Sequence, residues 1–398
     1  MLRCCCLLLT LLAPSILAAE IQTLSGKKLA GEPIGLDGQS LILRTPDGEV
    51  RHPIADVLAI GLGAEPAVAG PFVGVELTDG SSLNCVKTTF GPKALEVKLT
   101  TDQELSIPYT AIASICRDAH DARIRAEFQQ FAARRGRFDQ VAVRSEGRLN
   151  ALDGTLGDGL AGGDGLEFSV AGSDQKSAPK LDRVAGFVFA NRGDPAAPPT
   201  ICRVYDVGRN RLAAADVRWT NAGVTIKTST GLTVAYPSTA SLTRLDFSQG
   251  KLVWLSDLTP ARAETRISTE DSPSFGQFVR YRRDRNLENG PLRIDGTTFA
   301  RGLGIHAGTV LVYELGGEYS QFRAMVGVDE SVQTDSRVEL VVDGDGRELF
   351  RGTVSRRDPL RPLTLDVRNV RQLTIEVRPV GLLELGGEIN LADARISK

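Results

Sequence analysis

The feature that most constrains the fold is a series of short segments in which apolar and polar residues alternate, separated by Asp-Gly, glycine-rich or proline-bearing turns. Such alternation puts one face of a strand in a core and the other in water, which predicts antiparallel β-sheet. The pattern recurs over residues 20–68, 69–117, 138–193 and 200–248. Because a repeat of roughly 50 residues buries little as a flat sheet, we expect each to curl into a small SH3-like β-barrel or to pack on its neighbours.

One stretch interrupts the β pattern. Across 118–137 the apolar side chains, among them Phe128 and Phe131, recur at helical spacing. Asp118 or Asp121 could cap the first turn. We therefore expect one connecting helix between the second and third repeats.

The first 19 residues differ in composition from the rest. Arg3 precedes a short apolar run, and small residues lead up to the polar Glu20. This order is typical of a secretory signal peptide, and the run is shorter than the roughly 20 residues that a bilayer span requires. We expect the chain to be exported to a periplasm, a cell surface or the medium, with no transmembrane segment in the mature chain.

Composition and motifs limit the function classes. Hydrophobic residues make up 42% and charged residues 24%, as in a soluble globular protein, and the net charge of −2 gives no attraction for nucleic acid. The three histidines fall in three different predicted regions, and the sequence holds no GxSxG, HExxH, CxxC or phosphate-loop motif. We expect a protein that is not an enzyme and carries no cofactor.

Three cysteines follow the predicted signal peptide. Cys85 and Cys116 both fall in strand-like segments of the second repeat, so a disulfide between them is an option in an oxidising compartment. Cys202 would then be a buried, unpaired side chain.

The region 250–398 has its own pattern. Five alternating segments supply enough strands for two facing sheets, namely 311–315, 322–328, 338–342, 363–367 and 373–377. Ahead of them, the turn Asp295-Gly296 is followed by the run Gly302-Leu-Gly-Ile-His306. We expect the glycines of this run to form a tight turn that presents His306 in a fixed direction.

These motifs give the region its resemblance to a known family. The run from Gly302 to Ala307, the opening Trp254-Leu-Ser-Asp257 and the later strands are similar in order to the NPCBM family of carbohydrate-binding modules. The resemblance implies a galactose-binding-like jelly-roll β-sandwich and noncatalytic binding of a polysaccharide or glycoconjugate. Leu391 stands where the family usually has a tryptophan, and Asn390 where it has an acid.

The resemblance makes five residues candidates for carbohydrate binding: His306, Asp284, Asp329, Glu330 and Asn390. His306 could bind a sugar hydroxyl or orient a loop. The three acids could line the rim, supply oxygen ligands to a structural Ca²⁺, or cap turns. The sequence thus favours an exported noncatalytic glycan-binding protein, and the alternative is a cell-envelope scaffold whose repeats bind other envelope proteins.

Overall fold

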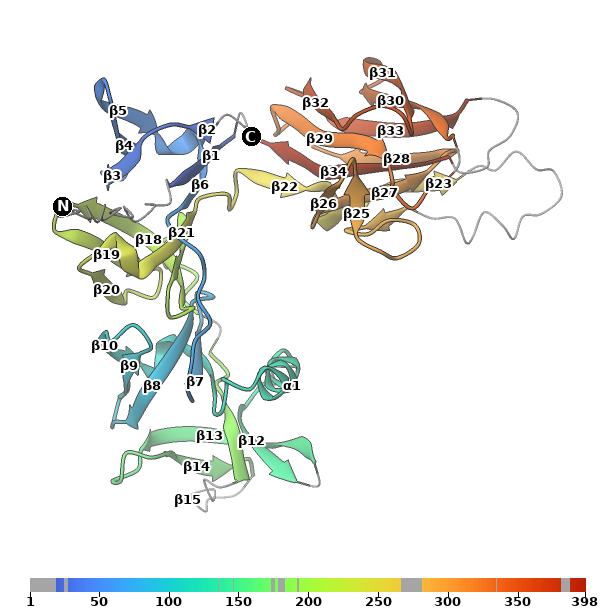
Figure 1. Cartoon of the computed structure of the whole chain (residues 1–398). Helices are drawn as coiled ribbons and strands as arrows, with labels where there is room; N and C mark the ends of the chain where they lie inside the picture. The colour runs from blue at the N-terminus through green and yellow to red at the C-terminus, as the bar shows by residue number, and fades with distance from the viewer. Residues whose placement is uncertain are drawn as a thin grey trace, which may run out of the picture. The chain divides into compact units, whose positions relative to one another are not determined.

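A computed structural model describes residues 19–24, 28–134, 136–145, 147–172, 176–177, 183–191, 193–265, 281–333, 335–380 and 387–398. The predicted signal peptide, except Ala19, lies outside the described residues. The chain divides into two compact units, Met1–Gln249 and Gly250–Lys398 (Figure 1). Strands dominate both units, which confirms the all-β class.

The first unit builds one five-strand meander four times. In each repeat the first four strands pair in sequence order, and the fifth returns to pair with the first. In the first repeat the second strand is split in two. The strands are β1 (Glu20–Thr23), β2 (Lys28–Leu29), β3 (Glu32–Leu36), β4 (Ser40–Thr45), β5 (Gly48–Pro53) and β6 (Val57–Gly61); β7 (Val73–Leu77), β8 (Ser82–Phe90), β9 (Ala94–Leu99), β10 (Glu104–Pro108) and β11 (Ile112–Cys116); β12 (Asp139–Ser145), β13 (Arg148–Gly159), β14 (Leu166–Val170), β15 (Lys176–Ser177) and β16 (Val184–Val188); β17 (Cys202–Asp206), β18 (Arg211–Thr220), β19 (Gly223–Thr228), β20 (Thr233–Tyr236) and β21 (Leu242–Asp246).

The repeats join through their fifth strands. β6 pairs with β21, so the first repeat meets the fourth, and β11 pairs with β16, so the second meets the third. No ladder joins the fourth strand of a repeat to its fifth among the described residues, so the expected closed barrels are not formed. Pairing fifth strands instead satisfies their edge backbone groups and joins the repeats in two pairs. β18 pairs with β8 between these two pairs, and the apolar faces of all four repeats form one core.

The connecting helix is confirmed as α1 (Ala122–Ala132), which is shorter than the predicted stretch. Asp121 caps it, accepting from the backbone N–H of Arg123 at 2.8 Å and of Ile124 at 3.2 Å. Phe128 and Ala132 are its buried residues. No helix in the described part of the chain has the length and apolar character to cross a membrane.

The proposed disulfide is not formed, because Cys85 and Cys116 are both free and buried. They lie on strands that flank β7, opposite its neighbouring residues Val73 and Gly74. Strands two apart in a sheet are about 10 Å from each other, beyond the roughly 7 Å that a disulfide can bridge. The two side chains also belong to different apolar clusters, and burial raises the pKa of each thiol to about 12.

The second unit is a β-sandwich with its own core, as expected (Figure 1). In the six-stranded sheet, β24, β27, β34, β29 and β32 are neighbours in that order, and β22 pairs with β34; the five-stranded sheet runs β23, β28, β33, β30, β31. The bounds are β22 (Leu252–Trp254), β23 (Arg262–Thr265), β24 (Arg282–Arg283), β25 (Leu292–Ile294), β26 (Thr297–Phe299), β27 (Gly302–His306), β28 (Thr309–Glu314), β29 (Gln321–Val328), β30 (Arg337–Gly344), β31 (Arg347–Ser355), β32 (Arg361–Asp366), β33 (Gln372–Pro379) and β34 (Glu388–Ser397). β25 and β26 form a separate hairpin.

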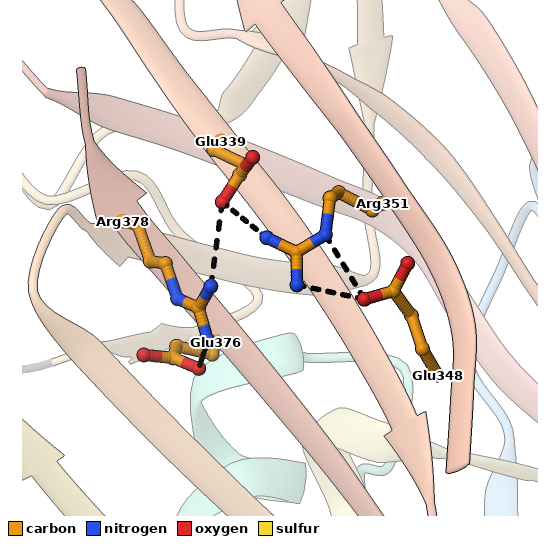
Figure 2. A network of polar contacts seen from close by, with 5 residues as sticks. All are labelled: Glu339, Glu348, Arg351, Glu376 and Arg378. Atoms are coloured by element: carbon orange, nitrogen blue, oxygen red, sulfur yellow. Dashed lines mark hydrogen bonds and ion pairs between the residues drawn. The ribbon is translucent and has the colours of Figure 1, made fainter.

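The outer face of the five-stranded sheet is charged. Glu339 on β30 accepts from Arg351 at 2.7 Å and from Arg378 at 3.5 Å, and the two arginines also pair with Glu348 and Glu376 (Figure 2). Cross-strand pairs of this kind keep a sheet face soluble and add little stability when they are exposed. The ion pairs therefore account for the charged side chains on this face without a ligand.

Candidate functional site

The glycine-rich run is a strand rather than the expected turn. Residues Gly302–His306 form β27, and the chain turns only after it, at Gly308 with a φ of +83°. A Cβ added to Gly304 would lie 2.7 Å from the carbonyl oxygen of Arg285, and one on Gly327 of β29 would lie 2.2 Å from Cγ2 of Ile294. The glycines are therefore needed because residues 284–299, here named the covering segment, lie directly on this sheet face.

The covering segment ends in the β25–β26 hairpin. Asp295 and Gly296 have φ of +48° and +72° and connect paired strands, as in a two-residue type I′ turn. Glu330, at the end of β29, accepts from the N–H of Gly296 and donates its own N–H to the carbonyl of Arg293 at 3.1 Å. Glu330 therefore holds the hairpin in place.

Asp329 is the centre of the contacts beneath the covering segment. It is 1% exposed. Its carboxylate accepts from Nδ2 of Asn286 at 2.9 Å, from Oγ of Ser331 at 2.6 Å and from Nδ2 of Asn390. The backbone N–H groups of Ser331 and Arg293 donate to it at 3.0 and 3.3 Å. These donors tie the covering segment, β29 and β34 to one carboxylate.

The hydrogen bonds decide the protonation state of Asp329. Burial by itself raises the pKa of this carboxyl, but the donors from Ser331, Asn390 and Asn286 outweigh it and leave the pKa below its usual value. Asp329 is thus an anion near neutral pH. Its oxygens are occupied by protein groups and are not presented to solvent.

Asp284 holds the other end of the covering segment. It accepts from Nη1 of Arg301 at 2.9 Å and from the N–H of Gly302 at 3.0 Å. Asp284, Asp329 and Glu330 thus bind three different sets of protein groups. Among the described residues no three His, Cys, Asp or Glu side chains are placed to share a metal ion.

His306 lies on the last position of β27, paired across the ladder with Glu388 of β34. Its Nδ1 is 2.7 Å from the carbonyl oxygen of Ala307. A carbonyl can only accept, so Nδ1 donates its hydrogen to it and Nε2 is the ring nitrogen left for another partner. Burial, together with the charges of Asp329 and Glu288, raises the pKa of Glu388, while His306 lowers it.

The five candidate residues are therefore divided among different positions. Asp329, Glu330 and Asn390 meet under or beside the hairpin, whereas Asp284 lies at the far end of the covering segment. His306 is half-buried at the rim.

Sequence reasoning missed Glu388, Asn286 and Ser331, because no motif marks them and only the folded strands bring them near Asp329 or His306. Leu391 is fully buried in the sandwich core, so its difference from the family affects packing and not the rim.

Residues 251–397 match the NPCBM/NEW2 domain. This confirms the family resemblance for the second unit.

One curated relative is 33% identical over 66 residues, which are 17% of this chain and 4% of the relative. It is named "Putative endo-alpha-N-acetylgalactosaminidase" and comes from Renibacterium salmoninarum. The chain thus spans a small fraction of that protein.

The solved structures that are similar to the chain include two sets of CBM51 modules. One is a CBM51 from the GH95 protein of Clostridium perfringens in complex with methyl-galactose, with 21% identity, a TM-score of 0.32 and coverage of 37% of this chain and 99% of that one. The other holds the tandem CBM51 modules of Sp3GH98, a family 98 glycoside hydrolase from Streptococcus pneumoniae. It has 11% identity and a TM-score of 0.32, and the match covers 95% of this chain and 87% of that one.

Proposed function

We propose, from the premise that residues 251–397 form an NPCBM/NEW2 domain, that this chain is an exported, noncatalytic protein that binds glycan at the rim formed by His306 and Glu388. The observation that carries the proposal is this cross-strand pair of an imidazole and a carboxyl. Side chains fixed in direction by strands and by a backbone hydrogen bond are suited to reading sugar hydroxyls.

The surrounding contacts support a binding role for this pair. Asp329 and Asn390, each 1% exposed, lie within the domain and hold the covering segment beside the rim. Their role is to position the rim. The carboxyl oxygens of Glu388 can then accept from sugar hydroxyls, and Nε2 of His306 can pair with another hydroxyl, which is able both to donate and to accept.

The noncatalytic part of the proposal follows from the acids. Glycoside hydrolysis generally needs two carboxyl groups facing the same bond. Of the two acids whose charges act on Glu388, Asp329 uses its oxygens on Asn286 and Ser331, and Glu288 is an exposed residue of the covering segment. The carboxylate of Asp329 is thus not available to act together with Glu388 on one bond. Export rests on the signal-like segment 1–19 of the sequence.

The test is binding of the full chain to a glycan array, followed by titration calorimetry with each positive glycan. We expect His306→Ala and Glu388→Gln each to weaken binding about tenfold, which corresponds to one lost hydrogen bond of about 1.4 kcal/mol. His52→Ala and Glu49→Gln in the first unit are the matched controls and should bind like the unmodified chain.

Two results would contradict the proposal. If the chain bound no glycan on the array, the proposed function would be wrong. If both rim variants bound as tightly as the unmodified chain, the proposed site would be wrong. Release of new reducing ends from a bound glycan would contradict the noncatalytic part.

A second function, scaffolding of envelope proteins, is favoured by the edges of the repeats. Pairing through fifth strands leaves β5, β10 and β20 with one partner each in the described part of the chain. An edge strand with free backbone groups can add a strand from another protein. Cross-linking in the native envelope tests this, and recovery of the monomer alone would count against it.

A further inference from the structure

A cleft of about 380 Å³ lies between the second and fourth repeats, beside β10 and β20 (Figure 1). Its walls include every residue of β10, from Glu104 to Pro108, and the start of β20, at Leu232 and Thr233. Consecutive side chains of a strand point to opposite faces of a sheet, so a cleft that touches every residue of β10 borders the edge of this strand. In the described part of the chain, β10 pairs with β9 alone and β20 with β19 alone.

The backbone of β10 has hydrogen-bonding groups that point into this cleft. Just before the strand, the carbonyl of Gln103 accepts from the N–H of Leu99 on β9 at 2.8 Å, so the backbone of Gln103 points toward β9. Backbone groups of consecutive residues point to alternate sides of a strand, so those of Glu104 and Ser106 point away from β9. Each of these two residues therefore offers one N–H and one carbonyl to another strand.

β20 turns its open edge toward the same cleft. The carbonyl of Leu232 accepts from the N–H of Thr228 on β19 at 2.8 Å, and by the same alternation Thr233 and Ala235 point away from β19. The carbonyl of Ala235 accepts from Nε2 of Gln103 at 3.4 Å, which agrees with this direction. Oε1 of Gln103 is buried and has no hydrogen-bond partner among the described residues. The two open edges thus face each other, with one side chain reaching across.

The inner face of the cleft is apolar. Ile107 is buried, whereas Leu105, Ala111 and Leu232 are half-buried and pack at the margin of the core. A strand added to β10 directs every second side chain to this face. Aliphatic side chains at those positions would remove from water the apolar surface that the three half-buried residues leave exposed.

The outer face beside the same edge is acidic. Glu96, Asp102 and Glu104 are exposed there, and one cation, Lys98, forms an ion pair with Asp102 at 2.9 Å. Lys98 and Glu104 are cross-strand partners, and so are Glu96 and Ser106. Basic side chains at the remaining positions of an added strand would lie next to these acids and complement their charge.

We propose that the open edge of β10 binds an extended segment of a partner protein in which aliphatic and basic residues alternate. The segment adds to the sheet as a strand and pairs its backbone with Glu104 and Ser106. Its aliphatic side chains cover the inner face and its basic side chains meet the acids of the outer face. This inference rests on the scaffold function proposed above and names the chemistry of the partner; glycan binding in the second unit does not depend on it.

The experiment measures the fluorescence anisotropy of a labelled peptide, Lys-Val-Lys-Val-Lys-Val, titrated with the full chain. We expect saturable binding, and at least tenfold weaker binding of Glu-Val-Glu-Val-Glu-Val, because its carboxylates meet the acidic face. Ser106→Pro should weaken binding of the basic peptide at least tenfold, because proline lacks the N–H that points into the cleft. The pairing with β9 does not use that N–H, so the fold is kept.

Ser106→Ala is the matched control. It removes the hydroxyl, which donates to Oε1 of Glu96 at 2.6 Å, but keeps the backbone N–H, so it should bind like the unmodified chain. Glu49→Pro places a proline on the edge strand β5 of the first repeat and should also leave binding unchanged. Glu104→Gln should weaken binding about threefold and reduce its dependence on salt, because it removes one acid without altering the backbone.

Thermal melting of each variant shows that a lost affinity is not a lost fold. If Ser106→Pro melted well below Ser106→Ala, the charge-reversed peptide and Glu104→Gln would still decide the outcome. The proposal would be wrong if the basic peptide did not bind, if it bound no better than the acidic peptide, or if folded Ser106→Pro bound as tightly as Ser106→Ala.

Cross-linking in the native envelope separates this site from the scaffold function. Loss of the cross-links in Ser106→Pro, with cross-links retained in Ser106→Ala, is the expected result. Cross-links that persisted in Ser106→Pro would overturn the β10 site and leave the scaffold function in place. Recovery of the unmodified chain as monomer alone would instead remove the scaffold function itself.

Discussion

Asp206 in the repeats and Asp329 in the sandwich have the same exposed fraction, 1%, but Asp206 is surrounded by more protein, and its pKa is raised whereas that of Asp329 is lowered. Asp206 accepts from Oη of Tyr236 at 2.7 Å and from the N–H and Nδ2 of Asn210 at 2.8 and 2.9 Å. Asn210 in turn binds Asn84 of the second repeat, so Asp206 supports the junction of two repeats.

The difference lies in the balance between burial and donors. At Asp206 the free-energy cost of moving the charge out of water is larger than the stabilisation by its hydrogen-bond donors. At Asp329 the stabilisation by the donors is larger than that cost. Equal exposure therefore does not imply an equal electrostatic role. The comparison suggests that Asp329 stabilises its domain as an anion and that Asp206 is a tolerated charge in a polar junction.

The largest expected effect that tests this contrast is that of Asp329→Ala. It should lower the free energy of unfolding of the second unit by about 3 kcal/mol, because Asn286, Asn390 and Ser331 lose their acceptor. The chain's two tryptophans lie one in each unit, so Trp254 fluorescence in a Trp219→Phe background follows the second unit alone during urea unfolding.

Asp335→Ala is the control for this measurement. Asp335 forms an exposed ion pair with Arg357 at 2.9 Å, so its loss should change the free energy by no more than about 0.5 kcal/mol. Equal effects of the two substitutions would mean that the Asp329 contacts do not hold the covering segment.

The next effect is a pH dependence of opposite sign in the two units. When the pKa of a carboxyl is lower in the folded state, its contribution to stability is fully present above the ordinary aspartate pKa and is lost as pH falls through the folded value. The second unit should therefore lose the stabilisation by Asp329 in acid. A raised folded pKa does the reverse, so the contribution of Asp206 to the repeats should improve as pH falls from neutral.

Urea unfolding between pH 7 and 3 measures both slopes, with Trp219 and Trp254 as separate reporters. Asp329→Asn should reduce the loss in the second unit, and Asp206→Asn should remove the gain in the first. If both substitutions shifted stability in the same direction with pH, the contrast between the two carboxyls would be broken.

The smallest expected effect comes from a half-buried reference carboxylate on the surface of the five-stranded sheet. Glu339→Gln weakens the ion pairs with Arg351 and Arg378 on the outer face of the five-stranded sheet (Figure 2). We expect a loss of about 0.5 kcal/mol at low salt that disappears in 1 M salt, because water and ions screen such pairs. A loss as large as that of Asp329→Ala would show that burial does not separate the two cases.

Local patterns predicted the elements well. The alternating segments of the C-terminal region lie on β28, β29, β30, β32 and β33. Asp121 caps α1, and Asp295-Gly296 turns a hairpin. Each of these features depends on residues within a few positions of one another, so the amino-acid order is enough to specify it.

The candidate site could be predicted only in part. Asp329, Glu330 and Asn390 do gather in one region, but no sequence pattern indicates that Asp329 and Asn390 are buried. The sequence predicts a turn at the glycines of β27, because it does not show that another segment lies against them. Cys85 and Cys116 share a repeat, but β7 separates them.

The amino-acid order is sufficient to predict antiparallel strands with one helix, because the period of a strand or a helix depends on neighbouring residues. The pairing of fifth strands between repeats and the position of Asp329 under the covering segment arise only when the chain folds. Asp329 accepts from Asn286 and Asn390, 43 and 61 residues away, and no local pattern selects partners at that separation.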